Sequence, residues 1–257
     1  MAYPYVKADV LKLLLERRRD IRLLVDSGAF TAWKLGKPIK LDDYCRFLES
    51  LPVKPWRYFM LDVVGDPKTT LENYALMLKR GFNPIPIFTR GECPSVLDDY
   101  YKTSDVVGLG GIGQKEYVKG IMKHVGSRKC HWLGFTNLSF IKYFKPYMAD
   151  SSSWNIGARY ASCPLYLGRG QSLIYLQKKN VRAQLRNPQI VNAIQSLGLN
   201  PNDLMKTEKW NGGQSVTFKI GARSMRRLTE DVQTKLGTNL FLAAATKAAV
   251  EILLEES

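Results

Sequence analysis

Short apolar runs that end at a polar residue or a glycine recur along the first 150 residues of the chain. The first run, residues 23–25 (Leu-Leu-Val), stops at Asp26, and later runs stop at Asp62, at Arg90, at the glycine pair 110–111 and at Asp150. Such runs, bounded by turn residues, are typical of buried strands, and the segments between them have apolar residues at helical spacing. The alternation predicts six strand-then-helix units and a parallel sheet.

The spacing of these units favours an α/β fold in which the sheet closes as a (β/α)8 barrel of the TIM type, with the polar strand ends at one face. Two further strands would come from residues 158–167 and 215–220, or else the barrel is degenerate. We expect residues 31–40 to form a loop and the Ala- and Leu-rich residues 239–254 to form a terminal helix. The predicted barrel core covers residues 1–168, and a basic helical region, residues 169–257, completes the barrel and binds nucleic acid.

The chain is strongly basic, with 38 Lys and Arg residues against 23 Asp and Glu, a net charge of +15. The excess is concentrated in residues 169–227, which hold eleven basic and two acidic residues. This composition favours a polyanionic partner, although a basic surface that serves only solubility has the same signature. The candidate nucleic-acid contacts are Arg159, Arg169, Lys178, Lys179, Arg182, Arg223, Arg226 and Arg227.

The four cysteines, Cys45, Cys93, Cys130 and Cys163, are too far apart for the paired spacing of a zinc knuckle. We therefore expect reduced thiols and no metal site. The N-terminal residues lack the apolar core of a signal peptide, and no apolar run is long enough to span a membrane. These features predict a cytoplasmic protein with no membrane partner.

The carboxylates at the strand ends suit chemistry at an anomeric carbon, where one carboxylate attacks C1′ and another moves a proton on the leaving group. The glycine pair at 110–111 would let a planar ligand approach the backbone, and Phe30 could stack on it. Each acid also has a structural alternative: Asp26 could be a turn residue, Asp62 a helix cap, and Asp150, which precedes three serines, a capping residue. For Asp66, the cap is favoured.

Several strand ends resemble the motifs of tRNA-guanine transglycosylases, in the same order along the chain. Residues 26–30 (Asp-Ser-Gly-Ala-Phe) resemble that family's Asp-Ser-Gly-Gly-aromatic motif, 61–62 its guanine-reading aspartate, 88–91 its Gln-Gly strand, 108–112 its Gly-Gly-Leu turn, 133–135 its Met-Gly-Val strand, and 148–150 the strand with the nucleophile. The resemblance covers residues 22 to 160.

The resemblance implies a role for each matching position. Asp150 would be the nucleophile at C1′, Asp26 the general acid and base near the exchanging base, and Asp62 the group that reads the guanine N1 and 2-amino edge. The remaining substrate-binding residues would be Ser27, Phe30, Arg90, Gly110 and Gly111. The resemblance implies no cofactor.

The chain departs from the tRNA enzymes in ways that favour DNA as the substrate. It lacks their three-cysteine and histidine zinc site, because Cys163 is the only cysteine after Asp150. Arg90 stands at the glutamine position, and the arginine-rich stretch is reduced to Asn155, Gly157 and Arg159. The chain is also shorter, and we expect no RNA-binding appendage of the PUA type. A compact, basic chain without zinc is similar to the DpdA-type DNA-guanine transglycosylases of bacteriophages and bacterial islands.

The sequence therefore predicts a pentosyltransferase that exchanges guanine in DNA for a free 7-deazaguanine base, such as 7-cyano-7-deazaguanine. The alternatives are a tRNA-guanine transglycosylase, a non-catalytic nucleic-acid-binding subunit on the same scaffold, and a metabolic barrel enzyme that acts on a phosphorylated small molecule. The net charge of +15 disfavours the last of these.

Overall fold

The structure, a computed structural model, describes residues 1–4, 6–19, 21–134, 137–155, 160–168, 172–210 and 215–255. The chain divides into two compact units. The first comprises Met1–Phe135, Pro146–Met148 and Ala245–Lys247, and the second comprises Thr136–Lys145, Ala149–Ala244 and Ala248–Ser257.

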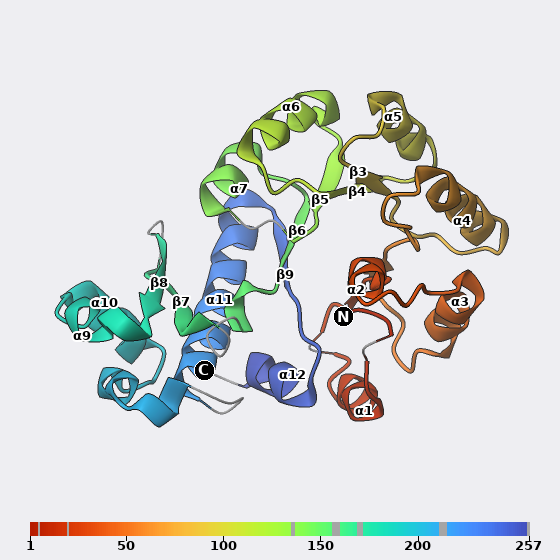
Figure 1. Cartoon of the computed structure of the whole chain (residues 1–257). Coiled ribbons are helices and arrows are strands. Elements are labelled where there is room, and N and C mark those ends of the chain that lie inside the picture. Colours follow the sequence, from red (N-terminus) through yellow and green to blue (C-terminus); the bar gives the residue numbers. More distant parts are fainter. Residues whose placement is uncertain are drawn as a thin grey trace. The chain divides into compact units, whose positions relative to one another are not determined.

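The first unit alternates strands and helices, as the apolar pattern predicts (Figure 1). Its elements are α1 (Ala8–Glu16), β1 (Leu24–Val25), α2 (Ala29–Lys34), α3 (Leu41–Ser50), β2 (Arg57–Tyr58), α4 (Pro67–Lys79), β3 (Ile87–Thr89), α5 (Pro94–Thr103), β4 (Val106–Gly110), α6 (Lys115–Val125) and β5 (Lys129–Trp132). The five strands lie within or beside the ranges expected from the sequence.

Neighbouring strands of the first unit run parallel and follow the chain order. The strands β1 and β2 pair with each other, a single parallel bridge joins Phe59 to Ile85, and β3 pairs with β4 and β4 with β5. The strands β3, β4, β5, β6 (Met148–Ser151) and β9 (Asn239–Leu242) form a five-stranded sheet in that order. The chain is therefore a mixed α/β protein, as predicted.

Local sequence explains where the helices begin. The side chain of Asp66 accepts hydrogen bonds from the backbone nitrogen of Thr69 at 3.0 Å and from its hydroxyl at 2.6 Å, and Pro67 occupies the first position of α4. The predicted helix-capping role of Asp66 is confirmed. The prediction that residues 31–40 form a loop is wrong in its first part, because α2 begins at Ala29, immediately after the turn at Gly28.

The second unit contains α7 and a compact region of strands and helices. In addition to most of β6 and of α12 (Lys247–Leu254), its elements are α7 (Leu138–Phe144), η1 (Ser153–Asn155), β7 (Ser162–Tyr166), β8 (Leu173–Gln177), η2 (Lys178–Asn180), α9 (Val181–Gln184), α10 (Pro188–Ser196), η3 (Pro201–Met205), η4 (Thr207–Trp210), α11 (Val216–Leu236) and β9. The helix α11 packs along β7.

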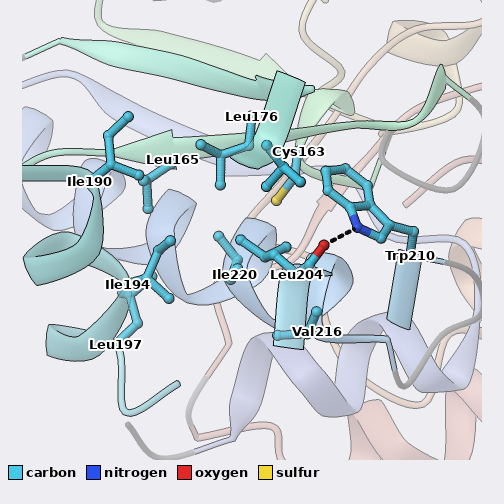
Figure 2. Packing of buried hydrophobic residues seen from close by; sticks show 11 residues of the cluster. Cys163, Leu165, Leu176, Ile190, Ile194, Leu197, Leu204, Trp210, Val216 and Ile220 are labelled. Carbon is cyan, nitrogen blue, oxygen red and sulfur yellow. Dashed lines mark hydrogen bonds between the residues drawn. The ribbon is translucent and has the colours of Figure 1, made fainter. Parts of the chain in front are cut away.

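The core of this unit is an apolar cluster between the β7–β8 hairpin and the helices α10 and α11 (Figure 2). Its buried members include Leu165, Ile194 and Ile220, each with no solvent exposure. Trp210 is also buried, and its indole nitrogen donates a hydrogen bond to the backbone oxygen of Leu204 at 2.8 Å. The bond satisfies the polar atom of a side chain that is otherwise packed in an apolar environment.

Three predictions for the second unit are wrong. Residues 215–220 do not form a strand, because the hydroxyl of Ser215 caps the backbone nitrogen of Phe218 at 3.2 Å and begins α11. The strand predicted near 158–167 is β7, but it pairs antiparallel with β8 in a separate two-stranded sheet. The predicted helix 239–254 is divided into β9 and α12.

Candidate active site

Ser27 links the two polar strand ends of β1 and β2. Its side chain is buried, and its hydroxyl donates a hydrogen bond to Oδ1 of Asp62 at 3.1 Å while it accepts one from the backbone nitrogen of Ala29 at 3.3 Å. The same turn brings the nitrogen of Gly28 within 3.3 Å of Oδ1 of Asp26, so Asp26 also has the turn contact that its sequence position suggested. The serine thus holds Asp62 in a fixed orientation.

Side chains from two helices hold the chain segment that leads to Asp62. The hydroxyl of Tyr44 in α3 donates to the backbone oxygen of Phe59 at 2.8 Å, and the amide of Asn73 in α4 donates to the backbone oxygen of Leu61 at 3.1 Å. Because β2 itself is only two residues long, these contacts supply part of the support that a longer strand ladder would give. These two hydrogen bonds therefore fix the backbone immediately before Asp62 and so the position of its carboxylate.

The electrostatic environment favours the protonated form of Asp62. Burial is the main cause and the negative charge of Asp26 is the second, and together they raise the pKa of Asp62 to about 6 despite the hydrogen bond from Ser27. A carboxyl group with a pKa in this range exchanges a proton close to neutral pH. This property is typical of acid and base groups in active sites.

The raised pKa of Asp62 predicts a dependence of stability on pH. An Asp with a folded-state pKa near 6 contributes stability below its unfolded pKa, and this contribution is lost as the pH rises through about 6. Between pH 4 and 7, the free energy of unfolding of the parent should fall by about 3 kcal/mol because of Asp62. Asp62→Asn keeps an oxygen that can accept from Ser27 but does not titrate, so this fall should be absent from the variant. Urea unfolding at several pH values measures this difference, and Asp99→Asn, at an exposed carboxylate, is the control.

An equal pH dependence in the parent and in the Asp62→Asn variant would contradict the assignment. The same result in the Asp99→Asn control would show that the general loss of an acidic residue, rather than burial beside Asp26, changes the profile.

The turn at Gly28 requires glycine for two reasons. Its φ angle is +77°, and a Cβ atom at this position would lie 1.7 Å from the backbone oxygen of Tyr3. The N-terminal residues are held there by the backbone bond from Tyr3 nitrogen to Asp26 oxygen, at 3.0 Å. The turn that follows Asp26 therefore depends on the close approach of the Gly28 backbone to the Tyr3 backbone.

Gly28→Ala should destabilise the protein by more than about 3 kcal/mol, because the clash with Tyr3 adds to the strain of the left-handed backbone. Gly36→Ala is a matched control, since Gly36 has φ +64° but no atom within 4 Å of the added Cβ. That variant should lose only about 1 kcal/mol. Thermal unfolding of both variants measures the difference, and equal losses would contradict the close approach.

Glu92 is a third carboxylate near the strand ends, and sequence reasoning missed it. It follows β3 by three residues, and its Oε2 accepts a hydrogen bond from the backbone nitrogen of Thr89. Burial raises the pKa of Glu92, and its charge contributes to the raised pKa values of Asp62 and Tyr117. Its position just after Arg90 and Gly91 at a strand end was the signal that could have identified it.

Arg90 and the glycine pair lie at the adjoining ends of β3 and β4. Thr89 is in register with Gly110, and the nitrogen of Arg90 donates to the oxygen of Gly110 at 3.3 Å. Gly111 has φ +68°, and a Cβ atom there would lie 3.2 Å from the Cβ of Arg90. The guanidinium of Arg90 lies 5.3 Å from the ring centre of Tyr117. The structure thus brings these three predicted residues together.

Phe30 is on the exposed surface of α2, beside a second aromatic residue. Its side chain and that of Trp33 are each 57 % exposed, and their rings are stacked with centroids 5.9 Å apart. The amine of Lys34 lies 4.3 Å from the Phe30 ring centre. Exposed aromatic rings with a neighbouring cation can stack on nucleobases. The sequence analysis does not predict Trp33 as a site residue.

Asp150 belongs to the second unit, where it lies half-buried in β6. The predicted nucleic-acid residues Lys178, Lys179 and Arg182 follow the β7–β8 hairpin in the same unit, and Lys179 and Arg182 are exposed. Arg159 and Arg169 lie outside the described residues.

The three arginines of α11 make contacts within the protein. Arg223 donates to the oxygen of Leu197 at 2.8 Å and pairs with Glu255 at 3.4 Å, Arg226 donates to the backbone oxygen of Glu255, and Arg227 donates to the hydroxyl of Ser196 at 2.7 Å. They join α11 to the end of α10 and to the residue that follows α12. Substitution of these arginines would therefore alter stability as well as any contact with a ligand.

Among the described residues, no group of three or more His, Cys, Asp or Glu side chains could hold a metal ion. No helix in this part of the chain combines the length and apolar character needed to cross a membrane.

The chain is thus a mixed α/β protein whose first unit holds two neighbouring carboxylates, Asp26 and Asp62, and Ser27 donates a hydrogen bond to the second of them. In comparisons with known proteins, no family model, curated protein or solved structure matches this chain.

Proposed function

We propose that this protein is a DNA-guanine transglycosylase that exchanges guanine for a 7-deazaguanine base, such as 7-cyano-7-deazaguanine. The observation that supports this proposal best is the hydrogen bond from Ser27, the residue after Asp26, to Asp62, at a site where burial and the charge of Asp26 raise the pKa of Asp62 to about 6. Base exchange needs carboxylates that recognise a base edge and move protons near neutral pH. The order of motifs along the sequence adds Asp150 as the nucleophile.

In the proposed reaction, a carboxylate oxygen of Asp150 attacks C1′ of the target deoxynucleotide. The electron pair of the glycosidic bond passes to the guanine nitrogen, which takes a proton from Asp26, so that neutral guanine leaves and an aspartyl ester remains. In the second half, Asp26 accepts the proton of the incoming deazaguanine nitrogen. This nitrogen attacks C1′ and releases the Asp150 carboxylate.

Asp62 would accept hydrogen bonds from the N1 and 2-amino groups of guanine. Only its ionised form can accept from both groups at once, so guanine uptake should weaken as the pH falls below about 6. Gly110 and Gly111 would offer backbone groups to the base edge or to its 7-substituent, and Arg90 would border the same surface. Phe30 would stack on a base, since its ring is exposed.

We further propose that the parallel strands belong to a degenerate (β/α) barrel of the TIM type. The support is the series of parallel neighbours in chain order, from β1 through the Phe59–Ile85 bridge to β5. In such barrels, the reacting groups lie at the carboxyl ends of the strands, as Asp26 and Asp62 do in the first unit.

A base-exchange assay tests this proposal. The protein is incubated with labelled guanine and one nucleic acid: duplex DNA, single-stranded DNA or tRNA. In a second set of reactions, 7-cyano-7-deazaguanine replaces guanine, and the recovered nucleosides are analysed by mass spectrometry. Incorporation into DNA supports the proposal, and incorporation into tRNA alone would identify a tRNA enzyme. Binding without incorporation under any condition would favour a non-catalytic nucleic-acid-binding subunit.

A further inference from the structure

A pocket of about 390 Å³ in the second unit is bordered by four basic side chains: Lys178, Lys179, Arg182 and Arg186. They come from η2, α9 and the residues just after them. No carboxylate is among the described residues that line this pocket. A concave surface lined by one sign of charge attracts anions more strongly than a flat surface with the same charge.

These four cations differ from other basic residues of the same unit. Lys206 pairs with Asp203 at 3.0 Å, Lys235 pairs with Asp231 at 3.3 Å, and Arg223 pairs with Glu255. Within the part of the chain that the structure describes, none of the four pocket cations forms an ion pair. Their charge is therefore available to a ligand.

Two apolar residues that line the pocket belong to the buried core of the unit. Leu204 and Trp210 line the pocket and are also members of the buried cluster in Figure 2, where the Trp210 indole donates to the Leu204 oxygen at 2.8 Å. Both residues are 1 % exposed. The basic side chains of the pocket therefore lie next to the packed core of the unit, so that ligand binding requires less ordering of the chain.

A second hollow, of about 440 Å³, shares Lys178 and Lys179 with the first. It is also lined by Tyr160, whose side chain is 69 % exposed. An exposed aromatic ring beside paired lysines suits a nucleic-acid strand, because the ring can stack on any base while the amines contact phosphates. A membrane surface offers no such planar partner.

We infer that these two hollows form a binding site for a single strand of nucleic acid, with phosphates at Lys178, Lys179, Arg182 and Arg186 and a base stacked on Tyr160. The inference shares a nucleic-acid ligand with the proposed function, but it concerns binding and does not depend on base exchange. The site lies wholly in the second unit.

The test measures the affinity of the full chain for a fluorescent single-stranded oligonucleotide over a range of salt concentrations. Replacement of all four pocket cations by alanine should weaken binding at low salt by at least about tenfold, and the slope of log affinity against log salt should fall by about 0.7 for each phosphate that the protein no longer neutralises. Replacement of Lys12, Lys79, Lys119 and Lys123, which are exposed on helices of the first unit, removes the same charge and should have a much smaller effect.

The tyrosine gives an independent readout. Tyr160→Ala should lower the affinity by about tenfold at every salt concentration, whereas Tyr160→Phe should bind as the parent does, because stacking needs only the ring. Thermal unfolding should show that all of these variants remain folded.

An unchanged salt slope in the fourfold variant, or equal losses in the two fourfold variants, would overturn the inference. So would loss of binding to phosphatidylserine vesicles with unchanged oligonucleotide binding, which would identify a membrane surface as the partner. Loss of binding in the pocket variant without any base exchange by the parent would retain this site and reject the proposed reaction. If the pocket variant exchanges bases and binds the oligonucleotide with normal affinity, the proposed reaction would be retained and this binding site rejected.

Discussion

Asp150→Asn is expected to abolish base exchange while the protein remains folded and binds DNA nearly as the parent does. The amide nitrogen and oxygen of asparagine are poor nucleophiles, so no bond to C1′ can form, although the side chain keeps its size. Asp150 is half-buried within β6, where an isosteric amide requires little rearrangement. The parent should form a covalent adduct with DNA that survives denaturing electrophoresis, and the variant should form none.

Asp203→Asn is the matched control for this experiment. Asp203 lies in the same unit and pairs with Lys206, so loss of its charge should leave both exchange and the covalent adduct intact. An Asp150→Asn variant that still exchanges bases, or that still forms the adduct, would remove Asp150 as the nucleophile.

Asp26→Ala is expected to lower the turnover number by about two to four orders of magnitude, because it removes the group proposed to move the proton of the leaving and arriving bases. A second effect follows from the electrostatics of the site. The charge of Asp26 contributes to the raised pKa of Asp62, so its removal should bring that pKa down and shift the acid limb of the guanine-binding profile to lower pH.

Asp66→Ala separates a catalytic effect from a structural one. Asp66 is a helix cap, with bonds to the nitrogen and hydroxyl of Thr69, and this variant should lose thermal stability but retain its turnover number. Equal kinetic damage in the Asp26 and Asp66 variants would show that the proposed pocket is misplaced.

The sequence predicts the first unit well because its signals are local. Apolar runs that end at Asp62 or at the glycines 110–111 mark the strands, and Asp66 caps the helix that follows β2, as its side-chain bonds to Thr69 show. The sequence predicts that Ser27 and Asp62 lie near each other, but it does not predict the hydrogen bond between them. Strand order places these residues at adjacent ends, but the contact itself joins positions 35 residues apart.

The errors arise where distant contacts override a local pattern. Asn239–Leu242 sits in an Ala- and Leu-rich segment that favours helix, yet it forms a strand next to β6, and the nitrogen of Ala243 donates to the oxygen of Ser151. Glu92 follows Arg90 and Gly91 at a strand end, but its electrostatic effect on Asp62 is visible only in the folded structure.

Basic composition also cannot separate two kinds of arginine. The predicted nucleic-acid residues included Arg223, Arg226 and Arg227, whose guanidinium groups bind backbone oxygens and side chains of α10 and of the C-terminal segment. Lys178, Lys179 and Arg182 come from the same basic stretch but line an open pocket. A variant at the lysines is therefore a cleaner probe of ligand binding.

The β7–β8 hairpin carries a further consequence for solubility. In the described part of the chain these two strands pair only with each other, and β8 has an exposed tyrosine, Tyr175. An open strand edge can pair with another copy of the protein, and lysines beside it discourage such aggregation by charge repulsion. Lys178 and Lys179 follow β8 directly, so they would protect this edge as well as contact phosphate. Lys179→Glu would weaken the attraction for phosphate yet keep a charge beside the edge, and it should remain monodisperse in light scattering.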